Sequence, residues 1–229
     1  MGVRFSGMSN KELIDHLIAD GVLADANAER AMRQTDRGHY CPYDAYADHP
    51  VPIGHSATIS APHMHAHALT TLKDYLRPGM RVLDVGCGSG YLSTCMARMV
   101  AGGGGGGSDP QQQGGIVIAI DYLPPLVALS QGNVAKADQD LVTAGTLTIL
   151  QGDGWKGHPA AAPFDAIHVG AAAASMPDAL VAQLKAPGRM VIPVGTGAQR
   201  FMQVDRDASG RVTTKTLFGV RYVPLVKLS

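Results

Sequence analysis

The residues with the clearest chemical meaning lie between Val82 and Gly90, where the chain reads VLDVGCGSG. Three glycines on alternate positions directly follow apolar residues, a pattern typical of a buried strand that turns sharply into a helix. A ligand can press against such a backbone because glycine carries no Cβ. The turn differs from the dinucleotide fingerprint, in which the third glycine comes one residue later, and Asp84 is a second difference. The alternative is a turn that binds nothing.

A carboxylate beside this turn suits a cationic ligand better than a pyrophosphate, and S-adenosylmethionine, with its sulfonium and ammonium groups, is such a ligand. Two further carboxylates support this interpretation. Asp121 follows the apolar run 116–120 and can accept hydrogen bonds from both ribose hydroxyls, and Asp153 follows 147–150 and can accept from an adenine amino group. Each alone could be a loop residue or a helix cap. Three of them at successive strand ends, where open α/β sheets bind ligands, predict an S-adenosylmethionine site.

Strand and helix patterns alternate around these residues, which predicts an α/β fold with a doubly wound, mostly parallel sheet. The expected strands are 80–85, 116–120, 146–150, 165–169 and 189–193, and the expected helices between them are 91–100, 124–137 and 177–184. Two more strand-like runs, 200–205 and 212–226, have no helix between them. They predict an antiparallel hairpin at one edge of the sheet.

The N-terminal part of the chain is expected to be helical. Ser9 and Glu12 form a capping box, and the helix that they begin ends at Gly21. Further helices are expected at 25–34 and 62–76. The stretch from Thr35 to Pro62 carries four prolines and is too long for a plain connector, which indicates a functional segment.

We expect a single domain over residues 1–229, because a chain of this length with 45% apolar residues can bury one large core. Within it, residues 1–78 form the helical segment that covers the site, and residues 79–229 form the cofactor-binding core. Residues 102–115 include six consecutive glycines. We expect them to be a flexible surface insertion at the end of the sheet opposite the glycine turn.

Composition argues against several classes of function. The 19 basic and 19 acidic side chains cancel, so the chain lacks the basic excess typical of nucleic-acid binding. No apolar stretch approaches the roughly 20 residues that cross a membrane, and three cysteines without a C-x-x-C pair argue against a disulfide framework. The start of the chain lacks the apolar core of a signal peptide. We therefore expect a cytoplasmic protein that binds neither nucleic acid nor membrane.

Several long motifs resemble one known family. They are the glycine turn, Tyr40, the run PIGHSATISAPHMHA at 52–66, Gly152–Gly154, DAIHVGA at 165–171 and GVRYVPL at 219–225. Together they cover essentially the whole chain, and most lie outside the generic cofactor fold. The chain is similar to the protein-L-isoaspartate (D-aspartate) O-methyltransferases, which are Rossmann-like class I methyltransferases dependent on S-adenosylmethionine.

The resemblance implies methyl transfer to the free α-carboxylate of L-isoaspartyl residues, and by the family name D-aspartyl residues, in damaged proteins and peptides. The ester would collapse to a succinimide, which begins repair, and S-adenosylhomocysteine would be the other product. A carboxylate is already ionised at pH 7, so the reaction needs no general base. The expectation includes no metal, and the protein is expected to act as a monomer on isoaspartyl peptides.

The resemblance also assigns residues. Ser60 is expected to be the catalytic residue, as a hydroxyl that positions the substrate. Together with the residues argued above, the expected cofactor-binding set is Ala57, Thr58, Ile59, Ser60, His65, Asp84, Gly86, Gly88, Ser89, Gly90, Asp121, Tyr122, Leu123, Pro124, Pro125, Gly152 and Asp153. The expected substrate-binding set is Ile53, Gly54, Ser60, Val220, Tyr222 and Val223. Residues 220–223 read as an extended apolar strand with which a peptide backbone could pair.

Three alternatives stay open at this stage. Ser60 could simply cap the helix that contains Pro62. Five histidines crowd one span, and two of them are four residues apart, as the ligands of a metal-dependent hydrolase would be: His49, His55, His63, His65 and His67. The chain could also be a catalytically silent adaptor that binds isoaspartyl proteins without methylating them.

Overall fold

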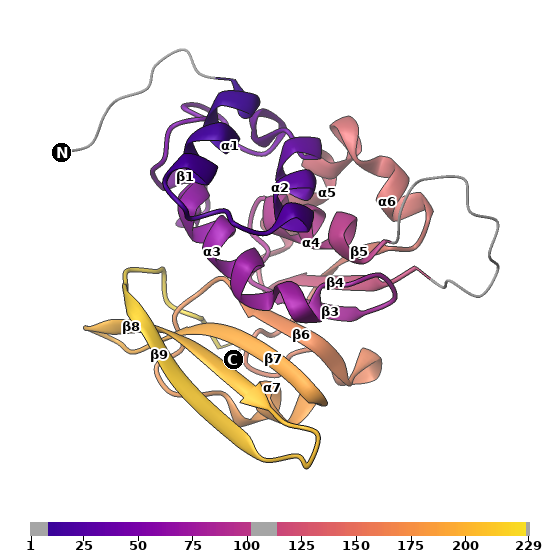
Figure 1. Ribbon diagram of the computed structural model, residues 1–229, viewed down its shortest axis with the longest axis vertical. Helices are drawn as coiled ribbons and strands as arrows, with labels where there is room; N and C mark the ends of the chain where they lie inside the picture. Colours follow the sequence, from indigo (N-terminus) through magenta and orange to yellow (C-terminus); the bar gives the residue numbers. More distant parts are fainter. Residues whose placement is uncertain (1–8, 102–113, 228–229) are drawn as a thin grey trace.

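A seven-stranded sheet with the order β5-β4-β3-β6-β7-β8-β9 forms the centre of the molecule (Figure 1). The computed structural model describes residues 9–101 and 114–227. The strands are β3 (Arg81–Val85), β4 (Ile116–Asp121), β5 (Leu147–Gln151), β6 (Phe164–Val169), β7 (Leu184–Val194), β8 (Gln199–Arg206) and β9 (Val212–Val220). Strands β3 to β7 are parallel, and β8 and β9 are antiparallel to their neighbours. The strand order reverses beside β3, where such sheets bind their ligands.

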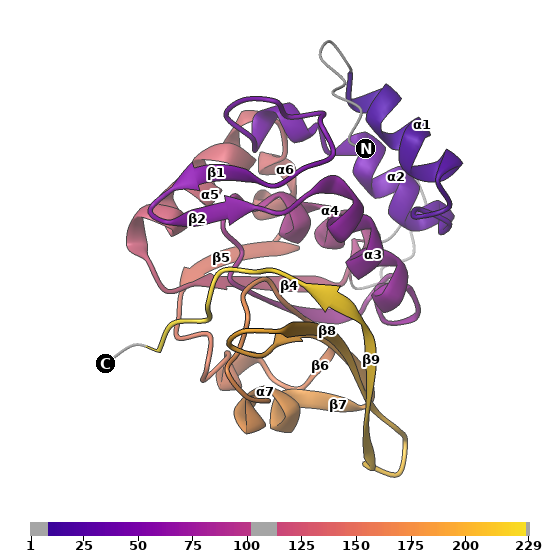
Figure 2. The same cartoon turned by 90° about the vertical axis from the view of Figure 1, so that its left-hand side faces the viewer.

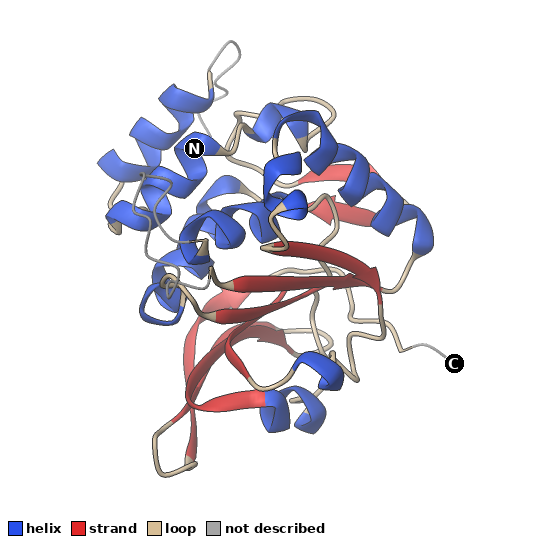
Figure 3. Ribbon diagram, turned by 90° about the vertical axis from the view of Figure 1, so that its right-hand side faces the viewer, coloured by secondary structure: helices blue, strands red, loops and turns tan. Residues whose placement is uncertain are grey.

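Alternate residues of each central strand enter two separate cores, because successive side chains of a strand point to opposite faces. Val82 and Val117 belong to one core, and Leu83 and Ile118 to the other. The first face is covered by α1 (Asn10–Ala19), α2 (Ala26–Gln34), α3 (Pro62–Leu72), α4 (Tyr91–Val100), α5 (Pro124–Ala137) and α6 (Gln139–Thr143), and the second carries α7 (Asp178–Gln183) (Figure 3). Short 3-10 helices lie at Arg37–His39, Lys73–Tyr75 and Pro159–Ala161.

The predicted fold class and order of elements are confirmed. The capping box of Ser9 and Glu12 is present, Asp25 caps α2, and α4 and α5 have the predicted bounds. The antiparallel hairpin β8–β9 lies at the sheet edge as expected. The short helix α6 was not predicted. The expected flexible insertion at 102–115 lies almost wholly outside the described residues.

The segment 35–62 contains a second, two-stranded sheet that the sequence did not reveal. Strands β1 (Val51–Gly54) and β2 (Ala57–Ile59) pair antiparallel. His55 and Ser56 form the turn between them, with positive φ angles of 52° and 57°. Turns of this kind are usually signalled by Asn-Gly or Asp-Gly. A His-Ser turn gives no such signal, so the hairpin could not be predicted.

The expected strand 212–226 is wrong beyond Val220, where β9 ends. The side-chain amide of Gln199 donates to the Tyr222 carbonyl at 3.0 Å and accepts from the Tyr222 N–H at 2.6 Å. Ala172 then donates to the Val223 carbonyl and accepts from the N–H of Leu225, each at 2.8 Å. These contacts draw the chain off the sheet edge and across the carboxyl ends of the strands (Figure 2).

Candidate active site

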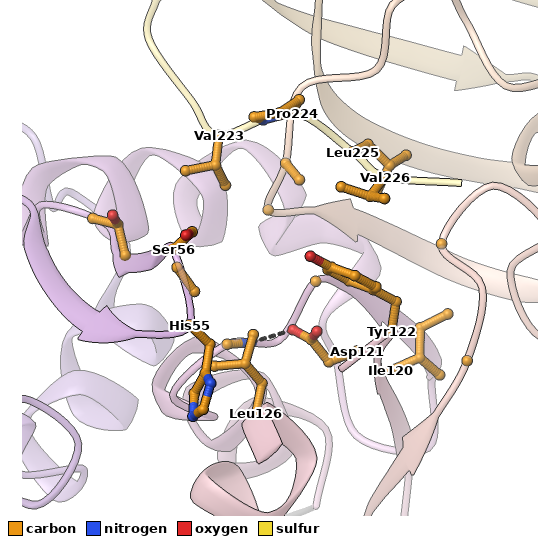
Figure 4. A pocket seen from close by; sticks show the side chains of 18 residues that line it. His55, Ser56, Ile120, Asp121, Tyr122, Leu126, Val223, Pro224, Leu225 and Val226 are labelled. Carbon is orange, nitrogen blue, oxygen red and sulfur yellow. Dashed lines mark hydrogen bonds between the residues drawn. The ribbon is translucent and has the colours of Figure 1, made fainter. Parts of the chain in front are cut away.

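A cavity opens at the carboxyl ends of β3 and β4, and we call it the glycine-turn cavity (Figure 4). The cavity and the open space at its mouth together span about 780 Å³. Its wall comes from the β1–β2 hairpin at 55–58, the glycine turn, the end of β4 at 120–122, Leu126, Gly152 and Gly154 after β5, Gly170 and Ala171 after β6, and the C-terminal segment 223–226.

The glycine turn has the backbone that its sequence predicts. Gly86, Gly88 and Gly90 all have positive φ angles, of 76°, 53° and 85°. A Cβ on Gly90 would lie 2.5 Å from the Ser130 hydroxyl, so only glycine fits there. Gly86 and Gly88 line the cavity directly. The chain therefore exposes backbone, without side chains, to whatever occupies this wall, as close contact with a ligand requires.

Asp121 ends β4 and points into the cavity (Figure 4). One carboxylate oxygen accepts from the Gly88 N–H at 3.1 Å and the other from the Leu123 N–H at 3.3 Å. Burial raises the pKa of Asp121, and these backbone N–H groups oppose that rise. Each carboxylate oxygen has a second lone pair. The oriented carboxylate can therefore still accept hydrogen bonds from a diol such as a ribose.

Asp84 has different partners. Its carboxylate is 1% exposed, accepts from the Ser93 hydroxyl at 2.5 Å and lies 2.7 Å from Nδ1 of His168 on β6. The carboxylate binds protein groups from two neighbouring elements instead of facing the cavity. It braces the start of α4, and the predicted contact with a cationic ligand has no geometric support.

The carboxylate of Asp153 is also bound by groups of its own turn. Its carboxylate accepts from the Trp155 N–H at 2.9 Å and lies 3.5 Å from the Lys156 ammonium. Its neighbours Gly152 and Gly154 line the cavity. A Cβ on Gly154 would lie 2.7 Å from Leu225, so this glycine lets the C-terminal segment close the wall.

A second cavity, of about 1030 Å³ to its opening, lies beside the first, and we call it the Ser60 cavity. Thr58, Gly170 and Val223 line both cavities. Ser60 and Tyr222, two predicted site residues, both line this cavity. Burial raises the pKa of Tyr222 to about 12, and the nearby Ser60 hydroxyl opposes the rise.

Ser60 is not the cap of α3. The N-cap residue of that helix is Ala61, and no side chain caps it. The alternative interpretation of Ser60 is therefore wrong, because the helix begins one residue later than capping by Ser60 would require. Ser60 instead lines the cavity.

Known proteins match nearly the whole chain. The family model of protein-L-isoaspartate(D-aspartate) O-methyltransferases matches residues 8–229. A protein-L-isoaspartate O-methyltransferase of Caenorhabditis elegans is 44% identical over 98% of this chain and 96% of its own length. One from Triticum aestivum is 45% identical over 96% of this chain and 92% of its own. This chain belongs to the protein-L-isoaspartate (D-aspartate) O-methyltransferase family.

A solved structure agrees with this assignment. It is a crystal structure of a Plasmodium falciparum protein described as a protein-L-isoaspartate O-methyltransferase, in complex with S-adenosyl-L-homocysteine. It shares 33% identity, covers 96% of this chain and 100% of its own, and has a TM-score of 0.87. The resemblance inferred from the sequence is thus confirmed, and the chain is a methyltransferase.

The remaining predicted residues of this methyltransferase divide into two groups. Ala57, Thr58 and Tyr122 line the glycine-turn cavity, and Val220 and Val223 line the Ser60 cavity. The others are not among the described residues that line these two cavities: Ile53, Gly54, Ile59, His65, Ser89, Gly90, Leu123, Pro124 and Pro125.

The predicted pairing of a peptide with residues 220–223 loses much of its basis. Gln199 occupies both backbone groups of Tyr222, and Ala172 occupies the carbonyl of Val223. The Tyr222 N–H is therefore not available to donate to a peptide backbone. The side chains at this point still line the Ser60 cavity.

The histidines of the methyltransferase have separate partners. His63 Nδ1 lies 2.9 Å from Asp48, His65 contacts Arg37, and the His67 ring packs on Phe218. Within residues 9–101 and 114–227, no three metal-binding side chains are grouped to hold an ion. The alternatives of a metal-dependent hydrolase and of a silent adaptor have no support from the structure or the relatives. No helix in these ranges is long and apolar enough to span a membrane.

Sequence reasoning missed several residues of the cavity wall. His55 and Ser56 reach it through the unpredicted hairpin, and 224–226 through the unpredicted path of the C-terminal segment. Gly170 and Ala171 lie in a motif that carried the family resemblance but received no role. The family motifs were the available signal, because His55 and Ser56 lie within 52–66, and Pro224 and Leu225 within 219–225. Their places in the wall still depend on contacts between distant segments.

Proposed function

We propose that this methyltransferase uses S-adenosylmethionine to methylate the free α-carboxylate of L-isoaspartyl residues, with the cofactor in the glycine-turn cavity and the substrate in the Ser60 cavity. The family and the relatives named for this reaction support the activity. The glycine turn, the oriented carboxylate of Asp121 and the apolar C-terminal wall fit the phosphate-free, partly apolar cofactor. When bound, the cofactor supplies a methyl group on an electrophilic sulfonium.

One observation carries the division between the cavities. Thr58, Gly170 and Val223 line both cavities, so a cofactor in one and a substrate in the other would lie next to each other. The substrate carboxylate is ionised at neutral pH and needs no base. The work of the protein is then alignment and exclusion of water, which can be worth about 7–11 kcal/mol.

Ser60 is suited to alignment in this scheme. Ser60 lines the substrate cavity, beside the residues that line both cavities. A hydroxyl in this place can donate a hydrogen bond to a carboxylate oxygen and direct the other oxygen towards the methyl group. We therefore assign Ser60 the role of a positioning hydroxyl.

The test compares matched peptides. The protein is incubated with methyl-labelled S-adenosylmethionine and peptides that differ only in carrying L-isoaspartate, D-aspartate or L-aspartate at one position. An isoaspartyl linkage moves the free carboxylate relative to the backbone, and a small misplacement can cost about a hundredfold. We expect the L-isoaspartyl peptide to be labelled at least that much faster than the L-aspartyl peptide, with or without a chelator. Equal labelling of these two would refute the proposal, and chelator-sensitive labelling would indicate a metal.

We further propose that the protein is a cytoplasmic monomer. Cys41, Cys87 and Cys95 are all free thiols, which suits a reducing compartment. The large apolar side chains exposed on the described surface, Tyr43, Val142, Val212 and Val226, come from four separate segments. Light scattering over a concentration series tests the monomer, and a dimer mass would contradict it.

A further inference from the structure

Arg37 is a fully buried arginine directly behind the Ser60 cavity. Its guanidinium donates to the Ser60 carbonyl at 2.8 Å through Nη2 and contacts Nδ1 of His65 at 3.3 Å through Nη1. It also lies over the Tyr91 ring, 5.4 Å from the centroid. Because a guanidinium only donates, Nδ1 of His65 must accept, and the proton of this histidine lies on Nε2.

The charge of Arg37 has no close counter-ion. In the described part of the chain no carboxylate oxygen forms an ion pair with it. Asp48 influences it from a greater distance, but that carboxylate is 42% exposed and is bound by His63 at 2.9 Å. Burial also lowers the pKa of His65 well below its usual range, so this neighbour is neutral. A buried cation without a partner is costly, and such an arrangement calls for a reason.

The position of Arg37 supplies that reason. A single backbone carbonyl, that of Ser60, separates its guanidinium from a residue that lines the substrate cavity. Protein around the guanidinium screens its charge less than water would. An anion in the Ser60 cavity would therefore be attracted by this cation.

We propose that Arg37 is a positioning residue that acts through Ser60 and His65, and that its buried charge makes the Ser60 cavity prefer a carboxylate over a neutral group of the same shape. The inference rests on the proposed function, because it takes the Ser60 cavity as the substrate site. It adds the group by which the enzyme recognises the charge of its target.

A purely structural arginine would behave differently. Its hydrogen bond to the Ser60 carbonyl would stabilise the segment equally for every ligand. A charge effect, in contrast, distinguishes ligands by their charge. The test therefore crosses protein variants with two peptides that differ only at the target group, an isoaspartyl peptide with a free α-carboxylate and its α-carboxamide.

Binding of both peptides is measured by titration calorimetry with S-adenosylhomocysteine present, so that no turnover occurs. We expect wild-type protein to bind the carboxylate at least about tenfold more tightly, as attraction between two opposite charges in a partly buried site implies. In Arg37→Met and Arg37→Gln the ratio should fall to about threefold or less, and Arg37→Lys should keep most of it. Arg206→Gln is the matched control, since Arg206 also donates to a backbone carbonyl, that of Leu184, but lies on β8. It should keep the wild-type ratio.

An unchanged ratio in Arg37→Met or Arg37→Gln would overturn the inference, and so would loss of the ratio in a folded Arg37→Lys. If neither neutral variant folds, the inference is tested on wild type and Arg37→Lys. It is refuted if either of these proteins binds the carboxylate and the carboxamide peptides equally. Labelling assays on wild type separate this from the proposed function. If wild type methylates the isoaspartyl peptide but the neutral variants keep their preference for the carboxylate, this inference is wrong and the proposed function still stands.

Discussion

At the scale of single residues, Asp84 and Asp121 show how surroundings decide the role of a carboxylate. Both lie in strands that end at the same edge of the sheet. His168 and Ser93 bind the carboxylate of Asp84, whereas two backbone N–H groups orient that of Asp121 and leave lone pairs facing the cavity. Of the two, only Asp121 lines the cavity, where its remaining lone pairs can bind a ligand.

Replacing Asp121 tests this difference. Asp121→Ala removes an ionised acceptor whose hydrogen bonds are worth about 1.5–3 kcal/mol. The affinity for S-adenosylmethionine should fall by roughly ten- to a hundredfold, at about 1.4 kcal/mol per decade. Calorimetry measures the affinity, and the exposed Asp207→Ala serves as control. Unchanged affinity in folded Asp121→Ala would remove this residue from the site.

Ser60→Ala should lower turnover while leaving the melting temperature almost unchanged. The hydroxyl caps no helix, so the stability loss of about 1 kcal/mol typical of a removed cap is not expected. Tyr222→Phe is the matched variant, because it removes another hydroxyl from the same cavity and leaves that of Ser60 in place. It should have a smaller effect on turnover. The assignment fails if Ser60→Ala melts lower but keeps its turnover per folded molecule.

The half-exposed pair of Asp48 and His63 should make stability depend on pH. The hydrogen bond with Asp48 raises the pKa of His63, although burial opposes the rise. Burial alone would raise the pKa of Asp48, but the hydrogen bonds from His63 lower it overall. The contribution of the pair is thus full between about pH 3.9 and 6.5. It is lost as pH rises through the raised pKa of His63, and as pH falls through the lowered pKa of Asp48.

Asp48→Asn should therefore destabilise the protein by roughly 0.2–1 kcal/mol near pH 5.5 and by less at pH 9. Urea unfolding at both pH values measures this. Asp74→Asn is the control, since its partner Arg77 stays charged throughout and its effect should not change over this range. An equal effect of Asp48→Asn at both pH values would show that the charge of His63 plays no part.

At the scale of elements, the two ends of β4 differ in function. Asp121 lies at its carboxyl end, at the cavity, whereas its first residue, Ile116, follows the segment 102–115. Gly115, directly before β4, donates to the Val100 carbonyl at 2.8 Å. The chain therefore enters β4 at the end of the sheet opposite Asp121.

Replacing residues 102–113 by a short turn should leave turnover within about twofold and stability within about 1 kcal/mol, because closure entropy changes only with the logarithm of loop length. Turnover and urea unfolding measure the two. Gly115 must be kept, since a Cβ there would lie 2.4 Å from the Met80 carbonyl. Gly115→Ala in the shortened protein is the destabilised control. A large loss of turnover without unfolding would place the segment at the substrate.

At the scale of the whole molecule, one buried carboxylate joins the N-terminal segment to the core. Asp138 lies between α5 and α6, is 1% exposed, accepts from the Tyr40 hydroxyl at 2.5 Å and pairs with Arg98 of α4. Three segments far apart in the sequence meet at this group. Such a contact favours one cooperative unit over separate N-terminal and core domains.

Asp138→Ala should cost about 3–5 kcal/mol, because it leaves a partly buried arginine without its partner. Unfolding followed by fluorescence and by circular dichroism should remain a single coincident transition. Asp74→Ala, which breaks an exposed pair, should cost less than about 1 kcal/mol. Two separate transitions in either protein would contradict the single domain.

Much of the fold could be predicted because it is encoded locally. Apolar periodicity gave α4 and α5 their bounds, and the alternation of strands and helices implied the parallel sheet. The β1–β2 hairpin was not predicted, because His55 and Ser56 adopt positive φ without the glycine or asparagine that usually marks such a turn. The residue at which β9 ends was not predicted, because the Gln199 side chain, not the local sequence, directs the backbone of Tyr222.

The sequence by itself determined the family, the order of elements and the glycine turn, because each depends on neighbouring residues and on long motifs. Only the tertiary structure decided which carboxylate faces the cavity, where the C-terminal segment crosses, and that Arg37 lies buried behind Ser60. Each of these depends on contacts between distant segments, such as Asp84 with His168 or Trp155 with Leu225. A local pattern specifies an element and its apolar face, but the partner of a polar side chain exists only once the elements have packed together.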